Sequence, residues 1–327
     1  MVHAPLIVLL GNDDDDDDHR VLFDEIRRIG GAARRVHPDE LVIEVTAEGT
    51  RFHTGGAELR PDLLFGWVYE DYLVLGMNQL ETARLAGIPV VNSAMTLWQG
   101  QSKYLNSALL HRAGIAHLPV LWGRDEETLV SWTARRGYPM VTKPMMSSRG
   151  RGMACLTDEA AVRRHVAALD PAPEQYYVQP FVPAGHRDTR VLCVNHRAVA
   201  AVTRTAPPGT WISNAPGGGR SLAELDRDVC ELAERAAEAV GALFAGVDVA
   251  RDERTGDLRV YEVNTCPTCT ATFRELGLDP VPLTELAAFL VAAARDFDEA
   301  RRHWRPSVTV RPGLTVRPDS RSSSTTI

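Results

Sequence analysis

The most constraining feature of the sequence is the stretch from Gly246 to Asn264, which reads as one β-hairpin with charged residues on its strands. A turn centred on Thr255 sets Asp248 opposite Glu262 and Gly246 opposite Asn264. Cross-strand partners share a face of a sheet, and so do side chains two apart on one strand. The side chains of Asp248, Glu262 and Asn264 are therefore expected to converge on one face of an antiparallel pair.

The two carboxylates and the amide of this hairpin predict a site for a hard cation. Facing like charges destabilise a sheet unless a cation or solvent neutralises them. Magnesium suits the arrangement, because it takes few protein carboxylates and leaves room for waters and nucleotide phosphates. The alternative is a solvent-facing hairpin with ordinary surface acids, and the spacing alone does not exclude it.

Composition limits the class of protein. The chain has 327 residues, 44% of them hydrophobic, which is enough for two or three compact modules. No apolar run approaches the roughly 18 residues of a membrane span, and the start lacks a signal-peptide pattern, so we expect a cytoplasmic protein with no membrane partner. Asp13–Asp18 supply six negative charges of a formal net charge of −7. The rest of the chain has no basic field for nucleic acid, and five scattered cysteines argue against a disulfide framework.

The order of apolar and amphipathic segments predicts three modules and a tail. Residues 1–94 alternate strand and helix and read as a small α/β domain. Residues 95–178 and 179–304 each combine strands with helices. Residues 305–327 are rich in Pro, Ser, Thr and Arg, so we expect a disordered tail.

Local signals predict two helix boundaries and one loop. Ser221 and Glu224 form a capping box, which places a helix start at Ser221 and a stop near Gly241. A final helix is expected from Thr284 to about Trp304. The run Asp13–Asp18 follows the first strand and is predicted to be a solvated loop, with attraction of a cationic substrate as the alternative.

A lysine and a small-residue loop indicate a phosphate site. Lys143 ends a predicted strand just before the loop from Ser147 to Gly152, whose glycines let backbone N–H groups turn toward phosphate oxygens. A plain turn is the alternative. Lys103 begins a predicted helix, where its charge opposes the helix dipole, which indicates either an anion or a merely solvated side chain.

Two arginines on neighbouring strands indicate a second anion-binding element. If the loop between the strands is three residues, Asn195–Arg197, then Asp188 faces Arg204 and Arg190 shares that face. A two-residue loop would separate them, and we expect the three-residue loop. Two arginines in one cleft suit a carboxylate and a phosphate, whereas the alternative is a surface salt bridge to Asp188.

Cys266 and Cys269 form a Cys-x-x-Cys pair just after the hairpin. A zinc site needs two further ligands, and none lies nearby at suitable spacing. A thioredoxin-type motif would open a helix in a different βαβ context. We therefore expect small pocket-lining or core residues in preference to a functional thiol pair.

Taken in chain order, these elements resemble the ATP-grasp superfamily, and most closely its RimK-like (alpha-L-glutamate ligase-like) carboxylate-amine ligases. The resemblance runs from about Val91 to about Leu290. The stretch VQPFVPAGHRDTRVLCVNHRAVAAVTRTAPPGTWISN looks like the family's hinge and arginine strands, and AGVDVARDERTGDLRVYEVNTCP looks like its metal hairpin. The resemblance implies an α/β ATP-grasp fold, with a pre-ATP-grasp domain (1–94) and two ATP-grasp subdomains (95–178 and 179–304) that enclose a nucleotide cleft.

The resemblance also implies residue roles. The nucleotide phosphates would be held by Lys103 and Lys143 and covered by a loop with Ser147, Ser148, Gly150 and Gly152. The adenine would lie along Gln179, Pro180, Phe181 and Val182, and the nucleotide would also contact Asp188. The acyl phosphate would face Arg190, Arg204 and Asn214. Two Mg²⁺ ions, or Mn²⁺ in their place, would be held by Asp248, Glu262 and Asn264.

The implied activity is ATP-dependent formation of an amide bond through an acyl phosphate, with small-molecule carboxylate and amine substrates or a peptide. A macrocyclase of ribosomal peptides, a ligase that loads a carrier protein, and a non-catalytic nucleotide-binding module are the alternatives. Thr268 stands where relatives usually have glycine, on the acceptor side, so the substrate pair is left open. A homo-oligomer would fit the resemblance as well as a monomer.

Overall fold

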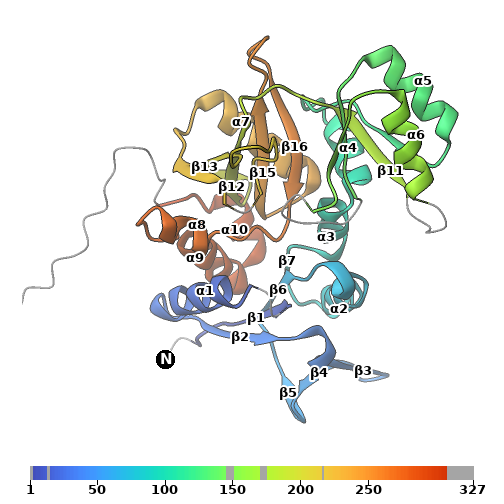
Figure 1. Cartoon of the computed structure of the whole chain (residues 1–327). Coiled ribbons are helices and arrows are strands. Elements are labelled where there is room, and N and C mark those ends of the chain that lie inside the picture. The colour runs from blue at the N-terminus through green and yellow to red at the C-terminus, as the bar shows by residue number, and fades with distance from the viewer. Residues whose placement is uncertain (1–2, 13–14, 145–150, 170–174, 216, 308–327) are drawn as a thin grey trace, which may run out of the picture.

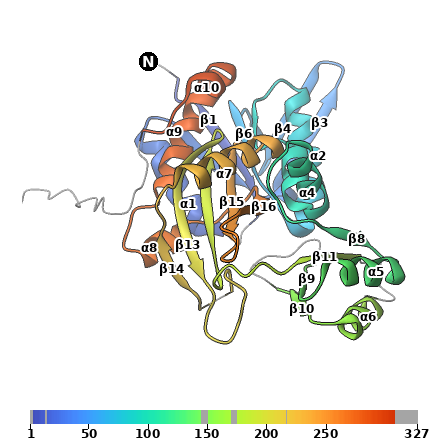
Figure 2. The ribbon, with the colours of Figure 1, turned by 90° about the horizontal axis from the view of Figure 1, so that it is seen from above.

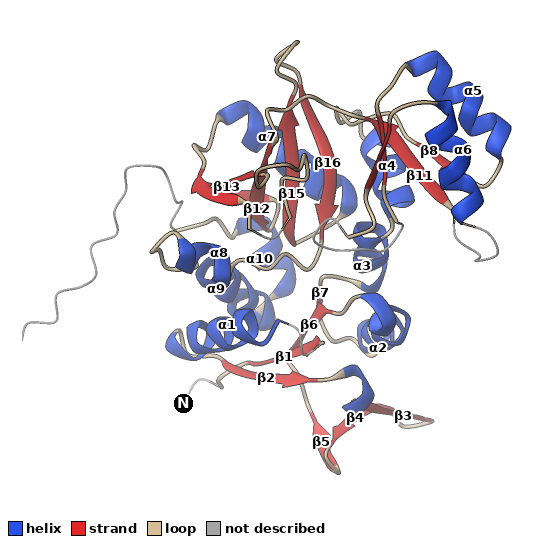
Figure 3. Cartoon of the chain, in the orientation of Figure 1, coloured by secondary structure: helices blue, strands red, loops and turns tan. Residues whose placement is uncertain are grey.

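A computed structural model of the chain describes residues 3–12, 15–144, 151–169, 175–215 and 217–307. These residues form four β-sheets with helices packed on their faces, in agreement with the expected mixed α/β class (Figures 1 and 3). Within this part of the chain, no helix is both long and apolar enough to cross a membrane. Most of the predicted tail, from residue 308 onward, lies outside the described residues.

The N-terminal sheet is parallel, with strand order β2-β1-β6-β7. Its strands are β1 (Leu6–Gly11), β2 (Ala32–Val36), β6 (Leu63–Trp67) and β7 (Val90–Val91). Alternate residues of β1 face opposite ways: Ile7 and Leu9 pack toward α1 (Asp16–Arg28), while Val8 and Leu10 pack toward α2 (Leu73–Leu85). Both faces of this sheet are therefore buried, as expected for parallel strands.

Beside this sheet lies a small antiparallel one made of β3 (Val42–Thr46), β4 (Gly49–Thr54) and β5 (Ala57–Leu59). Strand β3 therefore stands outside the alternation of strand and helix that the sequence predicts for residues 1–94. The strand that continues the alternation is β2, whose sequence AARRV lacks a clear apolar run.

A second antiparallel sheet, β10-β9-β11-β8, is set apart from the rest and is covered by two helices (Figure 2). Its strands are β8 (Leu121–Gly123), β9 (Met140–Thr142), β10 (Ala154–Leu156) and β11 (Tyr176–Pro180). The covering helices are α5 (Glu126–Arg136) and α6 (Glu159–Ala168). Two helices lead into it, α3 (Ala94–Gln101) and α4 (Lys103–Arg112), and the Ser102 hydroxyl caps the second.

The largest sheet has five antiparallel strands in the order β14-β13-β12-β15-β16. They are β12 (Arg187–Val194), β13 (Arg197–Thr205), β14 (Gly219–Leu222), β15 (Phe244–Arg251) and β16 (Leu258–Asn264). One face packs on α7 (Arg227–Val240) through Val191, Cys193 and Val247. The side chains that β12 places on the opposite face are, in order, Asp188, Arg190, Leu192 and Val194. The two charged residues lie at the end of the strand near a cleft, and the two apolar residues belong to a buried core.

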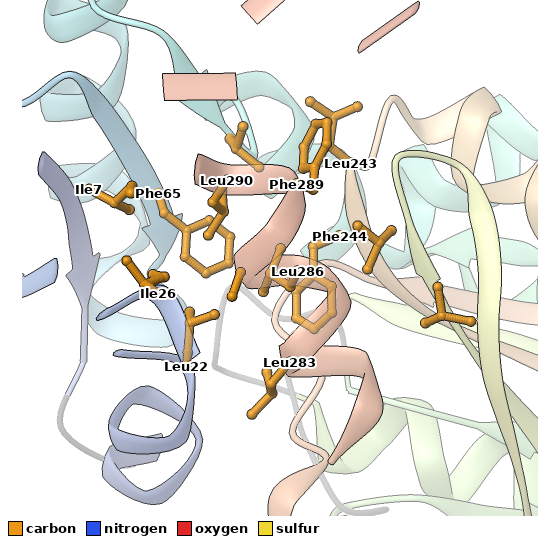
Figure 4. Packing of buried hydrophobic residues seen from close by; sticks show 14 of the residues in the cluster. Ile7, Leu22, Ile26, Phe65, Leu243, Phe244, Leu283, Leu286, Phe289 and Leu290 are labelled. Atoms are coloured by element: carbon orange, nitrogen blue, oxygen red, sulfur yellow. The ribbon is translucent and has the colours of Figure 1, made fainter. Parts of the chain in front are cut away.

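That core is shared with the N-terminal sheet. Helix α9 (Val281–Arg295) lies between the two sheets, and its Leu286 and Phe289 belong to one buried cluster with Phe65 of β6 and Phe244 of β15 (Figure 4). A helix near the C-terminus therefore completes the hydrophobic core of the N-terminal strands.

The predicted helix stop near Gly241 is confirmed as the C-cap of α7, whereas the predicted start at Ser221 and the single final helix are wrong. Ser221 lies in β14, opposite Thr203, and α7 begins six residues later with Asp226 as its N-cap. The edge strand β14 occupies the place where the capping box predicts the first residues of the helix. The predicted final helix is two helices, α9 and α10 (Phe297–His303), because Asp296 is extended and caps the second.

The acidic run is also not the solvated loop that the sequence predicted. Asp13 and Asp14 lie outside the described residues, but Asp15 and Asp18 are buried. Asp15 accepts a hydrogen bond from the Trp67 indole at 2.8 Å, and Asp16 begins α1.

Candidate active site

A cleft lies between α4 with the four-stranded sheet β10-β9-β11-β8 and the charged face of the five-stranded sheet. Ten of the predicted site residues line it: Lys103, Lys143, Gln179, Pro180, Phe181, Val182, Asp188, Asn214, Asp248 and Glu262. Arg190, Arg204 and Asn264 lie directly behind this lining and contact Asp248. Residues more than a hundred positions apart in the sequence therefore form one site.

The register of the β15/β16 hairpin agrees with the expectation at its charged end. Asp248 pairs with Glu262, and Gly246 pairs with Asn264. Toward the turn the register shifts, so that Val249 pairs with Val260 and leaves Tyr261 as the extra residue of a β-bulge. The bulge breaks the usual alternation of faces, and Tyr261 and Glu262 consequently both line the cleft.

The β12/β13 hairpin contains the same device. The predicted three-residue loop is wrong: Val194 pairs with Arg197, which leaves a two-residue turn, Asn195-His196, with positive φ at both positions. This is the geometry of a type I′ turn, which matches the twist of the flanking strands. A bulge then leaves Val199 of β13 as the extra residue opposite Leu192 and Cys193 and shifts the register by one, so Asp188 still pairs with Arg204.

The paired charges form a continuous ladder across three strands. Arg204 contacts Asp188 through its Nε at 2.7 Å and its Nη2 at 2.6 Å. The same Nη2 lies 2.8 Å from Asp248 Oδ2, so one guanidinium bridges two carboxylates. Arg190 donates two hydrogen bonds to Asp248, of 2.8 and 2.9 Å. These are buried, charge-assisted contacts, unlike the surface salt bridge weighed as the alternative.

The ladder controls the protonation of Asp248. Burial alone would raise the pKa of this carboxyl, but the positive charges of Arg190 and Arg204 outweigh burial and hold the pKa well below its usual range. Asp248 is therefore an anion at neutral pH even though its side chain is almost fully buried.

Glu262 differs from Asp248, because within the described residues its carboxylate makes no hydrogen bond or ion pair. It lies in the cleft near Lys143, whose pKa is lowered by burial and, to a smaller extent, by the charge of Lys103, while Glu262 raises it in part. The Lys143 ammonium also lies 5.4 Å from the centre of the Tyr261 ring. The cleft therefore offers an open carboxylate and a buried cation side by side.

The far wall of the cleft is apolar and includes residues that the sequence pattern did not single out. Trp211 packs edge-on against Phe181, with ring centres 5.7 Å apart, and Met153 lines the same region. Ser213 donates a hydrogen bond of 2.7 Å to Asp188, which ties the Trp211 loop to the ladder. Neither Trp211 nor Tyr261 has a charge or a motif partner, so only the fold reveals their position.

The predicted phosphate loop is described only at its C-terminal end. Ser147, Ser148 and Gly150 lie outside the described residues. Gly152 is described and has φ +71°, and a Cβ there would lie 2.6 Å from Pro144 Cγ. Glycine is therefore required where this loop rejoins the sheet.

The donor set suits a hard cation better than a soft one. Across the described ranges, no three His, Cys, Asp or Glu side chains are grouped to hold a metal. The site instead offers Glu262, Asp248 and the amide oxygen of Asn264, whose Nδ2 donates to Gly246 O at 3.2 Å. Cys266 and Cys269 are free thiols whose pKa values are raised well above the usual range by burial, in keeping with the expected core or pocket-lining role.

Comparisons with known proteins agree with this geometry. A family model of the RimK-like ATP-grasp domain matches residues 100–282. Probable alpha-L-glutamate ligase 2 of Hahella chejuensis is 26% identical over 259 residues, covering 75% of this chain and 84% of that protein. Alpha-aminoadipate–LysW ligase LysX of Saccharolobus solfataricus is 26% identical over 193 residues, covering 58% of this chain and 70% of that protein.

The fold has solved counterparts. The ATP-grasp ligase PsnB, complexed with a minimal precursor, matches with a TM-score of 0.70 at 19% identity, covering 89% of this chain and 99% of that one. The expected ATP-grasp fold is thereby confirmed, and the family model spans more than half of the chain. The chain therefore belongs to the RimK-like ATP-grasp family of ATP-dependent carboxylate-amine ligases.

Proposed function

We propose that this enzyme joins the carboxylate of one amino acid or peptide to an amine, through an acyl phosphate made with ATP. The observation that carries the proposal is the charge arrangement in the cleft: two lysines on one side, the arginine–aspartate ladder on the other, and the open carboxylate of Glu262 between them. Phosphoryl transfer needs positioned charges more than a protein nucleophile, and the cleft supplies such charges.

The positions of the residues support distinct tasks. Lys103 and Lys143 would bind the nucleotide phosphates, together with the loop of Ser147, Ser148, Gly150 and Gly152. Residues 179–182 and Trp211 form an apolar slot suited to the adenine ring. Asp188 would contact the nucleotide. Arg190, Arg204 and Asn214 would stabilise charge on the transferred group and hold the substrate carboxylate.

Mg²⁺ is the cation that this donor set fits best. One solved PsnB complex contains Mg and ADP. In this chain Glu262 would bind an ion directly, with Asp248 and Asn264 completing the protein ligands for two ions, and Mn²⁺ could replace them. When bound, the ions would neutralise phosphate charge.

The names of the relatives favour an amino acid as one substrate. Several are alpha-L-glutamate ligases, and LysX acts between alpha-aminoadipate and LysW. PsnB and the macrocyclase MdnC were solved with precursor peptides, which keeps a peptide substrate as the second candidate. The chain resembles both groups in fold, so substrate tests must separate them.

ADP release over a panel of single amino acids, short peptides and leader-bearing precursor peptides would test the proposal. Stimulation by amino acids or short peptides is expected, with an amide product detected by mass spectrometry. Stimulation only by a leader-bearing peptide would favour the macrocyclase. Bound ATP with no substrate-stimulated ADP from any of them would count against a ligase.

A matched pair of variants tests the metal assignment. Glu262→Gln should lower turnover by at least about hundredfold while the free energy of unfolding changes by less than about 1 kcal/mol, because this carboxylate has no partner to lose among the described residues. Asp257→Asn, in the turn of the same hairpin and 52% exposed, should leave turnover unchanged. Retained activity in Glu262→Gln would contradict the assignment of Glu262 as a metal ligand.

A further inference from the structure

The acidic run makes one contact that its low-complexity sequence does not reveal. Asp18, in the first turn of α1, is 5% exposed and lies against the start of α8 (Thr270–Glu275), 252 residues later in the chain. Its Oδ1 accepts hydrogen bonds from Cys269 N at 3.0 Å, Thr270 N at 2.8 Å and Thr270 Oγ1 at 2.8 Å. The Cys269 thiol lies 3.5 Å from the same oxygen.

The position of Oδ1 calls for an acceptor, because the groups that contact this oxygen are backbone N–H groups, a hydroxyl and a thiol, all donors. The N-cap residue of α8, Cys269, supplies no side-chain cap of its own, so Asp18 caps this helix from another part of the fold. The carboxylate also lies in the first turn of α1, and negative charge is favourable at the N-terminal ends of both helices. Next to it, Asp17 pairs with Arg274 of α8.

The anchored segment is the loop that leaves the β15/β16 hairpin, residues 265–270. At Gly246, opposite the Asn264 that precedes the loop, an added Cβ would lie 2.8 Å from Pro267 Cβ and 3.3 Å from Arg190 Cδ. The loop therefore packs over the sheet beside Arg190. It forms a wall next to the ladder and is not part of the nucleotide-side lining of the cleft.

Both ends of this loop are held by side chains from other elements. Asn92, at the end of β7, donates to Thr265 O at 3.1 Å and accepts from Leu243 N at 2.8 Å. Asp18 holds the other end at Cys269 and Thr270. Between these two anchors only three residues, 266–268, span the region beside Arg190.

We propose that Asp18 is a positioning residue for the substrate side of the active site, because it fixes the 265–270 loop against Arg190. The inference rests on the proposed ligase function and deepens it: the N-terminal domain contributes to how the enzyme holds its organic substrates. It also gives a described member of the acidic run a task other than attracting a cationic substrate.

Kinetics of three variants test this inference, with the best substrates from the amino acid and peptide panel. Asp18→Ala should raise the KM for the organic substrates by about tenfold or more, while the KM for ATP stays within about twofold, because the nucleotide side of the cleft is untouched. Asp18→Asn keeps an acceptor oxygen and should recover most of the loss. Asp16→Asn, whose exposed carboxylate pairs with Arg35 on the surface, is the matched control and should behave as wild type.

Two further readouts separate positioning from a general loss of structure. Hydrogen exchange of the amides at 269 and 270 should accelerate in Asp18→Ala, while that of β12 and β15 stays as in wild type. If the wild-type enzyme is active, either of two results for Asp18→Ala would overturn this inference and leave the proposed function intact. One is an equal rise of both KM values, and the other is an unchanged KM for the organic substrates. A wild-type enzyme without substrate-stimulated ADP release would instead remove the proposed function, and this inference with it.

Discussion

Arg190 and Asp248 face each other across β12 and β15 and share two hydrogen bonds, 2.8 and 2.9 Å long. Asp248 is also a proposed metal ligand, so the same carboxylate has to serve a guanidinium and a cation. This sharing makes the electrostatics of the ladder directly testable.

Arg190→Ala should bind Mn²⁺ more tightly than wild type and yet turn over at least about hundredfold more slowly. The reason is that removal of one positive charge leaves Asp248 more available to a cation, while the transferred group loses a stabilising contact. Electron paramagnetic resonance of Mn²⁺ gives the affinity. Arg197→Ala, on β13 at the far end of the sheet and 46% exposed, is the control. Weaker Mn²⁺ binding in Arg190→Ala would show that Arg190 orients Asp248 for the ion.

The bulge at Tyr261 predicts a contrast between two substitutions. Tyr261→Leu should raise the KM for ATP about three- to tenfold, because the aromatic face next to the Lys143 ammonium is lost and such contacts contribute about 0.5–2 kcal/mol. Tyr261→Phe keeps the ring and should stay close to wild type. Equal effects of the two changes would mean that the hydroxyl matters and the ring does not.

Lys143 predicts an alkaline limit to nucleotide binding. Burial lowers the pKa of this lysine, so it loses its proton at a lower pH than an ordinary lysine, and the neutral amine binds phosphate poorly. The affinity for ATP should therefore begin to fall at a pH that is still below the range in which ordinary lysines lose their proton. Lys143→Arg keeps its charge and should show a weaker decline in fluorescence titrations with an ATP analogue. Identical pH profiles for both proteins would assign the decline to another group.

The shared core predicts that the N-terminal sheet does not unfold by itself. Leu286→Ala on α9 should lower the free energy of unfolding by about 2–5 kcal/mol, as for other buried leucines. The transition should remain single when followed by tryptophan fluorescence, which includes Trp67 of the N-terminal sheet, and by circular dichroism. Leu85→Ala, 73% exposed on α2, should change stability by less than about 0.5 kcal/mol. Two separate transitions would contradict a common core.

The sequence spacing predicts which charged residues pair across the strands, but it does not predict the turn length and the bulges that produce this pairing. The predicted partner of Asp188 is correct although the predicted loop length is wrong, because the bulge at Val199 offsets the shorter turn. Bulges depend on packing against neighbouring strands and carry no fixed sequence signal. The same holds for Tyr261, whose position in the cleft follows from a bulge.

The errors elsewhere have a common cause in tertiary contacts. Ser221 and Glu224 match a capping box, but pairing with β13 extends the chain there and delays α7 to Arg227. The aspartate run reads as low complexity, yet its partners include Trp67 and Thr270, which are remote in sequence. Local patterns do not reveal such partners, whereas the stop of α7 at Gly241, which depends on a local glycine signal, is placed correctly.

The position of α9 has a consequence for biosynthesis. Strands β1 and β6 are among the first elements to leave the ribosome, but the helix that covers their inner face is made after every strand that the structure describes. Until then α1 covers Phe65 and Trp67 only in part, and a nascent chain that stalls before residue 281 would leave them partly exposed to chaperones or to aggregation. Shortening the gene from its 3′ end into α9 should therefore damage solubility before it damages any residue of the nucleotide cleft.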